Sequence, residues 1–200
     1  MLLDAQDAQL VLVDYQARLL PALHEGEAVL ANGLRLAQLA QLMRVPAWGT
    51  EQNPERLGPN PEAMRALCRE TLHKMAFSAC AEGLVECLRP MAKAPQGNAR
   101  SLPKHLQKAV PQAPSRNSVV IAGCEAHVCL LQTALELLEE EFDVWVVTDA
   151  CASRTERNRD AAFDRLASAG AELLTTEMVA FEWLRSAEHP QFKAIQALIK

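Results

Sequence analysis

Aromatic residues are scarce in this chain, and no cluster of lysine and arginine is interleaved with them. Phe, Trp and Tyr make up 4% of the 200 residues, and the formal net charge is -5 at pH 7. Proteins that bind nucleic acid need positive charge for the phosphates and often stack aromatic rings on the bases. The composition therefore predicts that nucleic acid is not a partner.

Long apolar runs and a positively charged leader are also missing. No run approaches the ~18 apolar residues that suggest a membrane helix. The first ten residues, MLLDAQDAQL, place Asp4 and Asp7 where a signal peptide carries positive charge. We therefore expect a cytoplasmic protein with no membrane partner.

The six cysteines lack the spacing of a metal site or a redox pair. They contain no Cys-x-x-Cys pair, and no His/Cys cluster has zinc spacing. A cytosolic chain of this length does not need disulfides to fold. A free cysteine often packs as a small buried hydrophobe. We predict that role for Cys68, Cys80, Cys87 and Cys151.

The chain does have a regular alternation of apolar β-type runs with helical patterns. Its length, with 50% hydrophobic and 22% charged residues, is typical of one globular domain, placed at residues 1–200. Continuously apolar strands separated by helices predict a parallel sheet covered on both faces. The predicted fold is a three-layer α/β/α Rossmann-like fold with a mostly parallel sheet of about six strands. The runs that indicate strands are 9–14, 45–50, 118–123, 143–149 and 171–176.

The helices are predicted from leucine spacing and from residues that begin or end a helix. Ser78 is expected to cap the start of one helix, and Gly170 to end another. Proline and glycine predict loops. The predicted helices cover 28–45, 78–91, 128–141 and 155–170, with two short ones at the end, and the predicted loops cover 51–62 and 94–117, the latter around one short helix.

Cys129 follows a strand–glycine–turn unit in SVVIAGCEAHVCLLQTA and stands at the start of a helix. Backbone N–H groups and the positive end of the helix dipole would surround its sulfur. Those features lower a thiol pKa and favour a nucleophilic thiolate. The alternative is a cysteine that simply packs at the strand–helix junction, and this residue alone does not decide between the two.

Asp14 and Lys74 are candidate partners for that thiol. Asp14 ends the first strand, where a doubly wound fold would put a general base, although such an aspartate is commonly a cap or turn residue. Lys74 lies in the rather apolar stretch LHKMAFSA. Its burial is expensive unless an acid pairs with it, and otherwise the side chain reaches solvent. Taken singly, each residue has an ordinary structural explanation.

Together these motifs resemble the isochorismatase-like cysteine hydrolase family, and the isochorismatase-domain-containing branch most closely. The resemblance rests on VDYQ, KMAFSA, IAGCEAHVCLLQTA and VVTDACASR in that order, with TEQNPERLGP and HPQFKAIQALIK pointing to the branch. It runs from about residue 9 to the C-terminus and is weakest at 92–116. Several ordered motifs are more specific than any one of them.

The resemblance implies a set of active-site residues. The family's Asp–Lys–Cys triad falls on Asp14, Lys74 and Cys129, and its main-chain oxyanion hole on Glu125 and Cys129. A cis peptide between Cys124 and Glu125 is also implied.

The implied reaction is hydrolysis of a small molecule through a thioester, and an amide or amidine-like C–N bond suits it. Nicotinamidases of the superfamily bind a metal through an acid and histidines after the second strand. Here that region, WGTEQNPERLG, has no histidine, so we expect no metal, and no organic cofactor is required. Family members are usually oligomers. A homo-oligomer, a dimer or larger, is therefore expected, with MVAFEWLRSA as its contact surface.

Two interpretations of Glu125 stay open, since its carboxylate can point into the pocket and select a polar or cationic substrate, or cap the helix. The loops that match the family also hold candidates to line the cleft. We predict substrate-binding roles for four of the six. The candidates are Tyr15, Gln16, Glu51, Gln52, Phe77 and His127, of which Gln16, Glu51, Phe77 and His127 are the four.

Two rival functions come from different classes. The first is a binding or scaffold protein that keeps the fold and has lost turnover; an intact triad argues against it. The second is a flavodoxin-like nucleotide or flavin binder. That would need a phosphate-binding glycine-rich turn after the first strand, and DYQARLLPALHEG supplies none.

Overall fold

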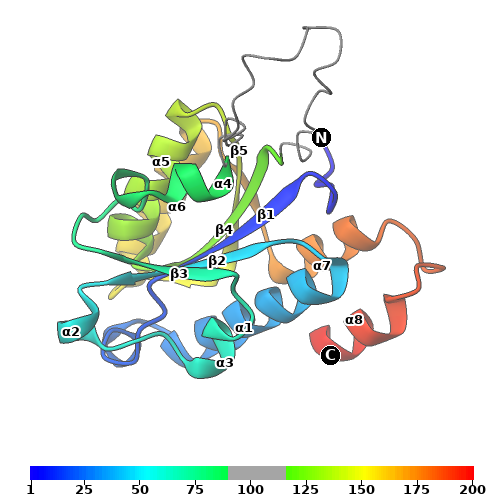
Figure 1. Ribbon diagram of the computed structural model, residues 1–200, viewed down its shortest axis with the longest axis horizontal. Helices are drawn as coiled ribbons and strands as arrows, with labels where there is room; N and C mark the ends of the chain where they lie inside the picture. The colour runs from blue at the N-terminus through cyan, green and yellow to red at the C-terminus, as the bar shows by residue number, and fades with distance from the viewer. Residues whose placement is uncertain (90–115) are drawn as a thin grey trace, which may run out of the picture.

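Six strands form one sheet in the computed structural model, which describes residues 1–89 and 116–200 (Figure 1). The strand order is β3-β2-β1-β4-β5-β6, and every pairing is parallel. This confirms the predicted Rossmann-like fold. The strands are β1 (Ala8–Val13), β2 (Ala47–Gln52), β3 (Glu70–Lys74), β4 (Ser118–Cys124), β5 (Asp143–Ala152) and β6 (Glu172–Leu174).

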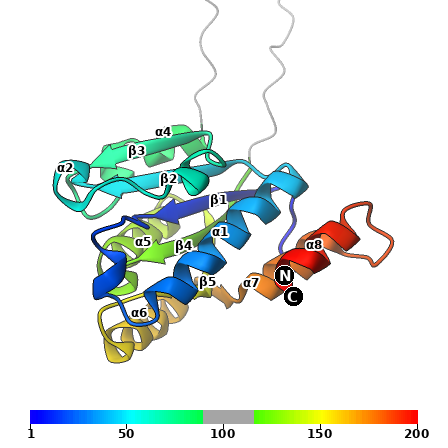
Figure 2. The same cartoon turned by 90° about the horizontal axis from the view of Figure 1, so that it is seen from below.

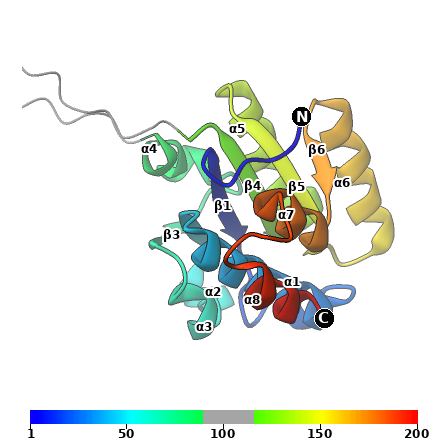
Figure 3. The same cartoon turned by 90° about the vertical axis from the view of Figure 1, so that its right-hand side faces the viewer.

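Helices cover both faces of the sheet and make the three layers (Figures 2 and 3). Helices α1, α7 and α8 lie on one face, and α4, α5 and α6 lie on the other. The helices are α1 (Gly26–Met43), α2 (Pro54–Leu57), α3 (Glu62–Arg65), α4 (Leu84–Leu88), α5 (Leu131–Glu139), α6 (Glu156–Ser168), α7 (Thr176–Leu184) and α8 (Phe192–Ile199). None of the helices described is both long and apolar enough to cross a membrane.

Three local predictions differ from the structure. Strand β3 was absent from the predicted runs because it lies at the sheet edge, where its residues are mostly exposed or half-buried and leave no apolar run. The predicted loop at 51–62 contains the single-turn helix α2, and α3 begins at its last residue. Gly83, with φ +97°, divides the predicted helix at 78–91 into a 3₁₀ turn (Cys80–Glu82) and α4. Most of the predicted loop at 94–117 lies outside the described residues.

The two central strands are buried along their whole length, which explains their continuous apolar sequence. They approach closely at Gly123: a Cβ there would lie 2.1 Å from the carbonyl oxygen of Val13. Gly33 of α1 makes room for the buried ring of Tyr15, whose hydroxyl donates to the carbonyl oxygen of Ala150 at 2.5 Å. These contacts fix β1, β4 and α1 around the point where the strand order reverses. Parallel α/β folds bind ligands there, at the carboxyl ends of the strands.

Candidate active site

The carboxylate of Asp14 lies directly after β1, at this reversal point. Its backbone has φ +51°, a left-handed conformation that aspartate and asparagine tolerate better than most residues. Thr50, near the end of β2, donates its hydroxyl to Oδ1 at 2.7 Å. Its other oxygen, Oδ2, faces the ammonium group of Lys74.

Lys74 ends β3, and its ammonium group is buried against that carboxylate. Nζ lies 2.8 Å from Oδ2 of Asp14, and neither side chain is exposed to solvent. Nζ also donates to Oε1 of Gln52 at 2.7 Å and to the carbonyl oxygen of Phe77 at 2.9 Å. The sequence-based pairing of Lys74 with Asp14 is therefore present, and the alternative of a lysine that reaches solvent is wrong.

Cys129 lies in a π-helical turn (Ala126–Leu130) that joins β4 to α5. π-helical turns are rare in proteins as a whole, and those that occur are often found at functional sites. The residue is 6% exposed, and its Sγ lies 3.9 Å from Oε1 of Gln52. The thiol thus reaches the same amide oxygen that holds the ammonium of Lys74.

The pKa of the Cys129 thiol is raised, from 9.0 to about 12. Burial is the largest cause, the negative charge of Asp14 adds to it, and the positive charge of Lys74 opposes it. The sequence-based expectation of a lowered pKa is therefore wrong for the free protein. Burial and the nearby carboxylate outweigh the lysine, so the thiol is protonated at neutral pH.

Glu125 begins this turn, and its peptide bond with Cys124 is cis, as the family resemblance implies. Its side chain does not cap the helix. The carboxylate instead accepts from Nε of Arg154 at 2.6 Å and from the second guanidinium nitrogen of Arg154 at 3.3 Å. The capping interpretation is therefore wrong, and the charge of Glu125 is neutralised by Arg154.

His127 makes a second contact between the same two loops. Its Nδ1 lies 2.9 Å from Oγ of Ser153, and its Nε2 lies 3.4 Å from the side-chain nitrogen of Asn158. The loop between β5 and α6 therefore holds the cysteine-bearing turn at two points, Glu125–Arg154 and His127–Ser153.

Two predicted substrate-binding residues, Gln16 and Glu51, point into the protein. The carboxamide of Gln16 is buried and donates to the carbonyl oxygens of Gln52 and Gly58 at 3.0 and 2.5 Å. Glu51 is 1% exposed and accepts from the backbone N–H of Asn60 at 2.8 Å. Both side chains are used to hold the loop after β2. These contacts give both residues a structural role, and their substrate-binding role stays a prediction.

Glu51 has two further neighbours, since its Oε2 lies 3.2 Å from Nε2 of His73 and its Oε1 lies 3.7 Å from Nε of Arg65. Phe77, the remaining predicted substrate-binding residue, is 53% exposed. It contributes its carbonyl oxygen to Lys74 while its ring stays free of the core. Tyr15 is fully buried and belongs to the packing of α1.

Gln52, Thr50 and Arg154 contribute more to the site than the sequence indicated. Gln52 and Thr50 are two residues apart near the end of β2, so both side chains leave the same face of the sheet. That period, applied to TEQ, groups Gln52 with Thr50 and puts Glu51 on the opposite face. Arg154 gave no signal beyond its place at the end of VVTDACASR.

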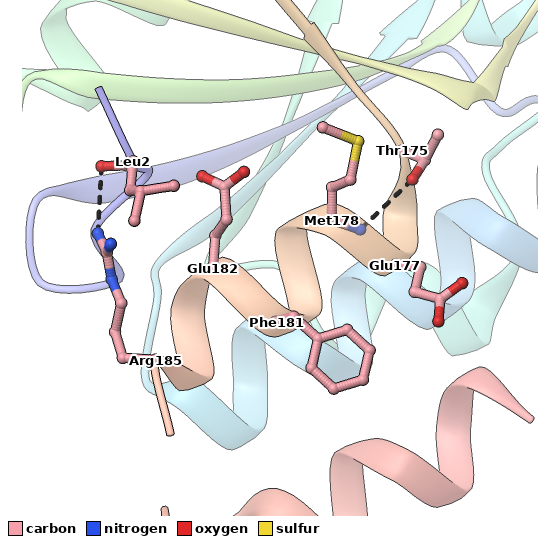
Figure 4. A pocket seen from close by; sticks show the side chains of 7 residues that line it. All are labelled: Leu2, Thr175, Glu177, Met178, Phe181, Glu182 and Arg185. Atoms are coloured by element: carbon pink, nitrogen blue, oxygen red, sulfur yellow. Dashed lines mark hydrogen bonds between the residues drawn. The ribbon is translucent and has the colours of Figure 1, made fainter. Parts of the chain in front are cut away.

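The site is thus a buried Asp–Lys ion pair beside a protonated cysteine, drawn from the ends of β1, β3 and β4. Within the described part of the chain, no three His, Cys, Asp or Glu side chains gather as a metal site. A surface hollow of about 460 Å³ lies elsewhere, between α7 and the N-terminal segment (Figure 4).

The family model of the isochorismatase domain matches residues 8–178 of this chain. The chain belongs to the isochorismatase family. Mouse isochorismatase domain-containing protein 2A is 34% identical over 191 residues, which is 96% of this chain and 82% of the mouse protein. The family resemblance drawn from the sequence motifs is confirmed.

Two solved structures of related proteins have similar folds. The MAR1 ribonuclease from Caenorhabditis elegans superposes with a TM-score of 0.83 at 27% identity and covers 100% of this chain and 92% of its own. The YcaC gene product of Escherichia coli, described as an octameric hydrolase of unknown specificity, has a TM-score of 0.83 at 28% identity, over 100% and 89% of the two chains.

Proposed function

We propose that this isochorismatase-family protein is a cysteine hydrolase that cleaves an amide or amidine-like C–N bond in a small molecule. Cys129 is the nucleophile, Asp14 the base and Lys74 their electrostatic partner. The observation that carries this proposal is the buried Asp14–Lys74 pair, 2.8 Å apart, beside the Cys129 thiol. A buried ion pair next to a nucleophile, at the strand ends where parallel α/β folds bind ligands, is a strong candidate for a catalytic centre.

The reaction begins with a protonated thiol, so removal of its proton must accompany attack. Oδ2 of Asp14 takes the proton as Sγ of Cys129 bonds to the substrate carbon. The negative oxygen, or nitrogen in an amidine, then faces the backbone N–H groups of Glu125 and Cys129. Asp14 returns the proton to the leaving nitrogen as the C–N bond breaks, which leaves a thioester from an amide or a thioimidate from an amidine. A water molecule that gives its proton to Asp14 then attacks the same carbon, the C–S bond breaks, and Asp14 passes the proton to Sγ, which restores the thiol.

Lys74 acts through its charge in this scheme. Its ammonium group already contacts Asp14, Gln52 and the carbonyl oxygen of Phe77, so its donors are occupied. It stabilises the carboxylate and then the developing thiolate without giving up a proton. Every step uses protein groups and water, and we propose that no metal or organic cofactor takes part.

A small molecule suits this site better than RNA, although the C. elegans relative is named a ribonuclease. RNA binding needs exposed positive charge, whereas the chain has a net charge of -5. At the site Lys74 is buried and Arg154 is paired with Glu125. Incubation with single-stranded RNA is therefore expected to yield no cleavage products.

The proposal predicts the behaviour of Cys129 in a screen of small amides and amidines. A substrate should release ammonia or amine, and acid quenching should trap an acyl group on the peptide that contains Cys129. Cys129→Ser and Asp14→Asn should abolish turnover, and Cys87→Ala, at a half-buried cysteine of α4, should not. Turnover that survives Cys129→Ser would rule out the nucleophile.

The alternative function is a binding or scaffold protein without turnover. The raised pKa and low exposure of Cys129 favour it, because a protonated, nearly buried thiol is inert until a base acts on it. A ligand that stabilises the protein against heat, with no product and no adduct on Cys129, would support this alternative over the hydrolase.

We further propose that the protein is one domain over residues 1–200 and acts in the cytoplasm as a homo-oligomer. All six cysteines are free, as is usual in a reducing compartment. The octameric E. coli relative supports self-association. Exposed side chains of Leu2, Met178 and Phe181 surround the hollow on α7 (Figure 4), and exposed apolar patches commonly mark protein contacts.

Light scattering after size exclusion tests this contact surface. The wild type is expected to have the mass of a dimer or a larger assembly, and Phe181→Glu should lower it. Met75→Glu, at an exposed methionine outside the hollow, is the matched control. A monomeric wild type would contradict self-association, and an unchanged mass for Phe181→Glu would exclude this surface.

A further inference from the structure

We propose that Gln52 is a positioning residue that holds the ammonium group of Lys74 against Asp14 and Cys129, and that its neutrality is required. The inference rests on the proposed hydrolase centre and adds a fourth residue to it. Gln52 is not a candidate for proton transfer, because a carboxamide does not titrate near neutral pH.

Sheet register brings Gln52 to this place. It is the last residue of β2 and pairs with Lys74, the last residue of β3. Neighbouring residues of a parallel ladder project to the same face, and Oε1 of Gln52 accepts from Nζ of Lys74 at 2.7 Å. The same oxygen lies 3.9 Å from Sγ of Cys129. One atom thus contacts both the ammonium group and the thiol.

The carboxamide of Gln52 is held in a single orientation. Its Nε2 donates to the carbonyl oxygen of Met75 at 2.8 Å, so Oε1 must face Lys74. Gln16 fixes the backbone of the same residue: it accepts from the N–H of Gln52 at 2.8 Å and donates to its carbonyl oxygen at 3.0 Å. The buried side chain of Gln16 therefore supports Gln52.

Charge explains why an amide is needed here. The centre holds one carboxylate, Asp14, and one ammonium group, Lys74. A glutamate at position 52 has nearly the same shape but would put a second negative charge against the thiol. Like charges disfavour ionisation of a neighbouring acid, so Gln52→Glu should make the thiolate harder to form. Methionine stays neutral, but its thioether is only a weak acceptor, so Lys74 is held less well near the sulfur of Cys129.

Alkylation of Cys129 by iodoacetamide, read by peptide mass spectrometry, tests this without a known substrate. A pH of 9 is well below the thiol pKa of about 12. Each unit of change in that pKa therefore alters the labelling rate about tenfold. We expect Gln52→Glu to slow labelling about tenfold and Gln52→Met about threefold. Gln38→Glu, an exposed substitution on α1 that adds the same charge, should label at the wild-type rate.

Reference variants separate this inference from the proposed function. Asp14→Asn should speed the labelling of Cys129 at pH 9, and Lys74→Met should slow it. Suppose that Asp14→Asn and Lys74→Met shift the labelling rate as expected, but both Gln52 variants label at the rate of Gln38→Glu. The proposed role of Gln52 would then be wrong, and the hydrolase centre would stand. If neither Asp14→Asn nor Lys74→Met changes the rate, the proposed centre itself fails. Circular dichroism identifies any variant that has not folded, and either folded Gln52 variant is sufficient for the test.

Discussion

The carboxylate of Asp14 and the ammonium group of Lys74 face each other at 2.8 Å, and neither side chain is exposed on the protein surface. The two residues end strands that are not neighbours, β1 and β3, with β2 between them. The long side chain of Lys74 therefore crosses the end of β2 to reach Asp14. Thr50 and Gln52, both of β2, contact the two charged groups on the way.

Breaking this pair should be strongly destabilising. Lys74→Met would leave the carboxylate of Asp14 buried without its counter-charge, and such changes typically lower the free energy of unfolding by about 3–5 kcal/mol. The double variant Asp14→Asn/Lys74→Met removes both charges and should lose less than Lys74→Met alone. Urea denaturation of the wild type, both single variants and the double variant measures the coupling. Additive losses would mean that the two residues do not depend on each other.

Asp14→Asn should separate ionisation of the thiol from turnover. Because the charge of Asp14 raises the pKa of the Cys129 thiol, its removal should lower that pKa below about 12. Asparagine also tolerates the positive φ of this position, which limits structural damage. The variant should therefore be alkylated faster than the wild type at pH 9, yet have no hydrolase activity, because its base is lost. Slower alkylation in a folded variant would contradict the proposed arrangement.

The sequence predicted the fold and the central residues because they depend on continuous patterns. Apolar runs at β1 and β4 indicated buried parallel strands, and the ends of those strands led to Asp14 and Cys129. The sequence did not show that the side chains of Gln16 and Glu51 hold the loop after β2, because membership of a loop does not say which way a side chain points. Strand alternation does group Thr50 with Gln52 on one face of β2, and the structure shows that this face contacts Asp14 and Lys74.

The thiol pKa was mispredicted for a different physical reason. The position of Cys129 before a helix suggests a stabilised thiolate. Its pKa depends on how deeply the sulfur is buried and how close the Asp14 carboxylate lies. Both are tertiary properties without a local sequence signal. The Glu125–Arg154 pair also has no local sequence signal. Its partners are far apart in the chain and meet only because β4 and β5 are adjacent.

Stability should fall in alkaline solution because several thiols are harder to ionise in the folded protein. Burial raises the pKa of Cys151 from 9.0 to about 12. The unfolded chain loses this proton near pH 9 and the folded one does not, so the contribution is complete below pH 9 and is lost as the pH rises toward 12. Each such thiol contributes at most about 1.4 kcal/mol per pH unit.

Urea denaturation between pH 7 and pH 11 measures this slope, which Cys151→Ala should reduce. Cys87 is the matched control, because it is less buried and burial raises its pKa to a smaller extent. Cys87→Ala should leave more of the slope in place. A free energy of unfolding that does not change across this range would contradict the buried, protonated state of these thiols.

Arg154 should control the order of the turn that carries Cys129. The loop between β5 and α6 contacts this turn through Glu125–Arg154 and His127–Ser153, so Arg154→Ala leaves one contact and an unpaired, nearly buried carboxylate. Because Arg154 itself is exposed, global stability should change little. Hydrogen–deuterium exchange in peptides covering 124–130 should become about threefold faster, while peptides from α1 stay unchanged. Arg157→Ala, an exposed arginine on α6, is the control. Equal exchange in the two variants would show that the arginine pairs with Glu125 without holding the turn.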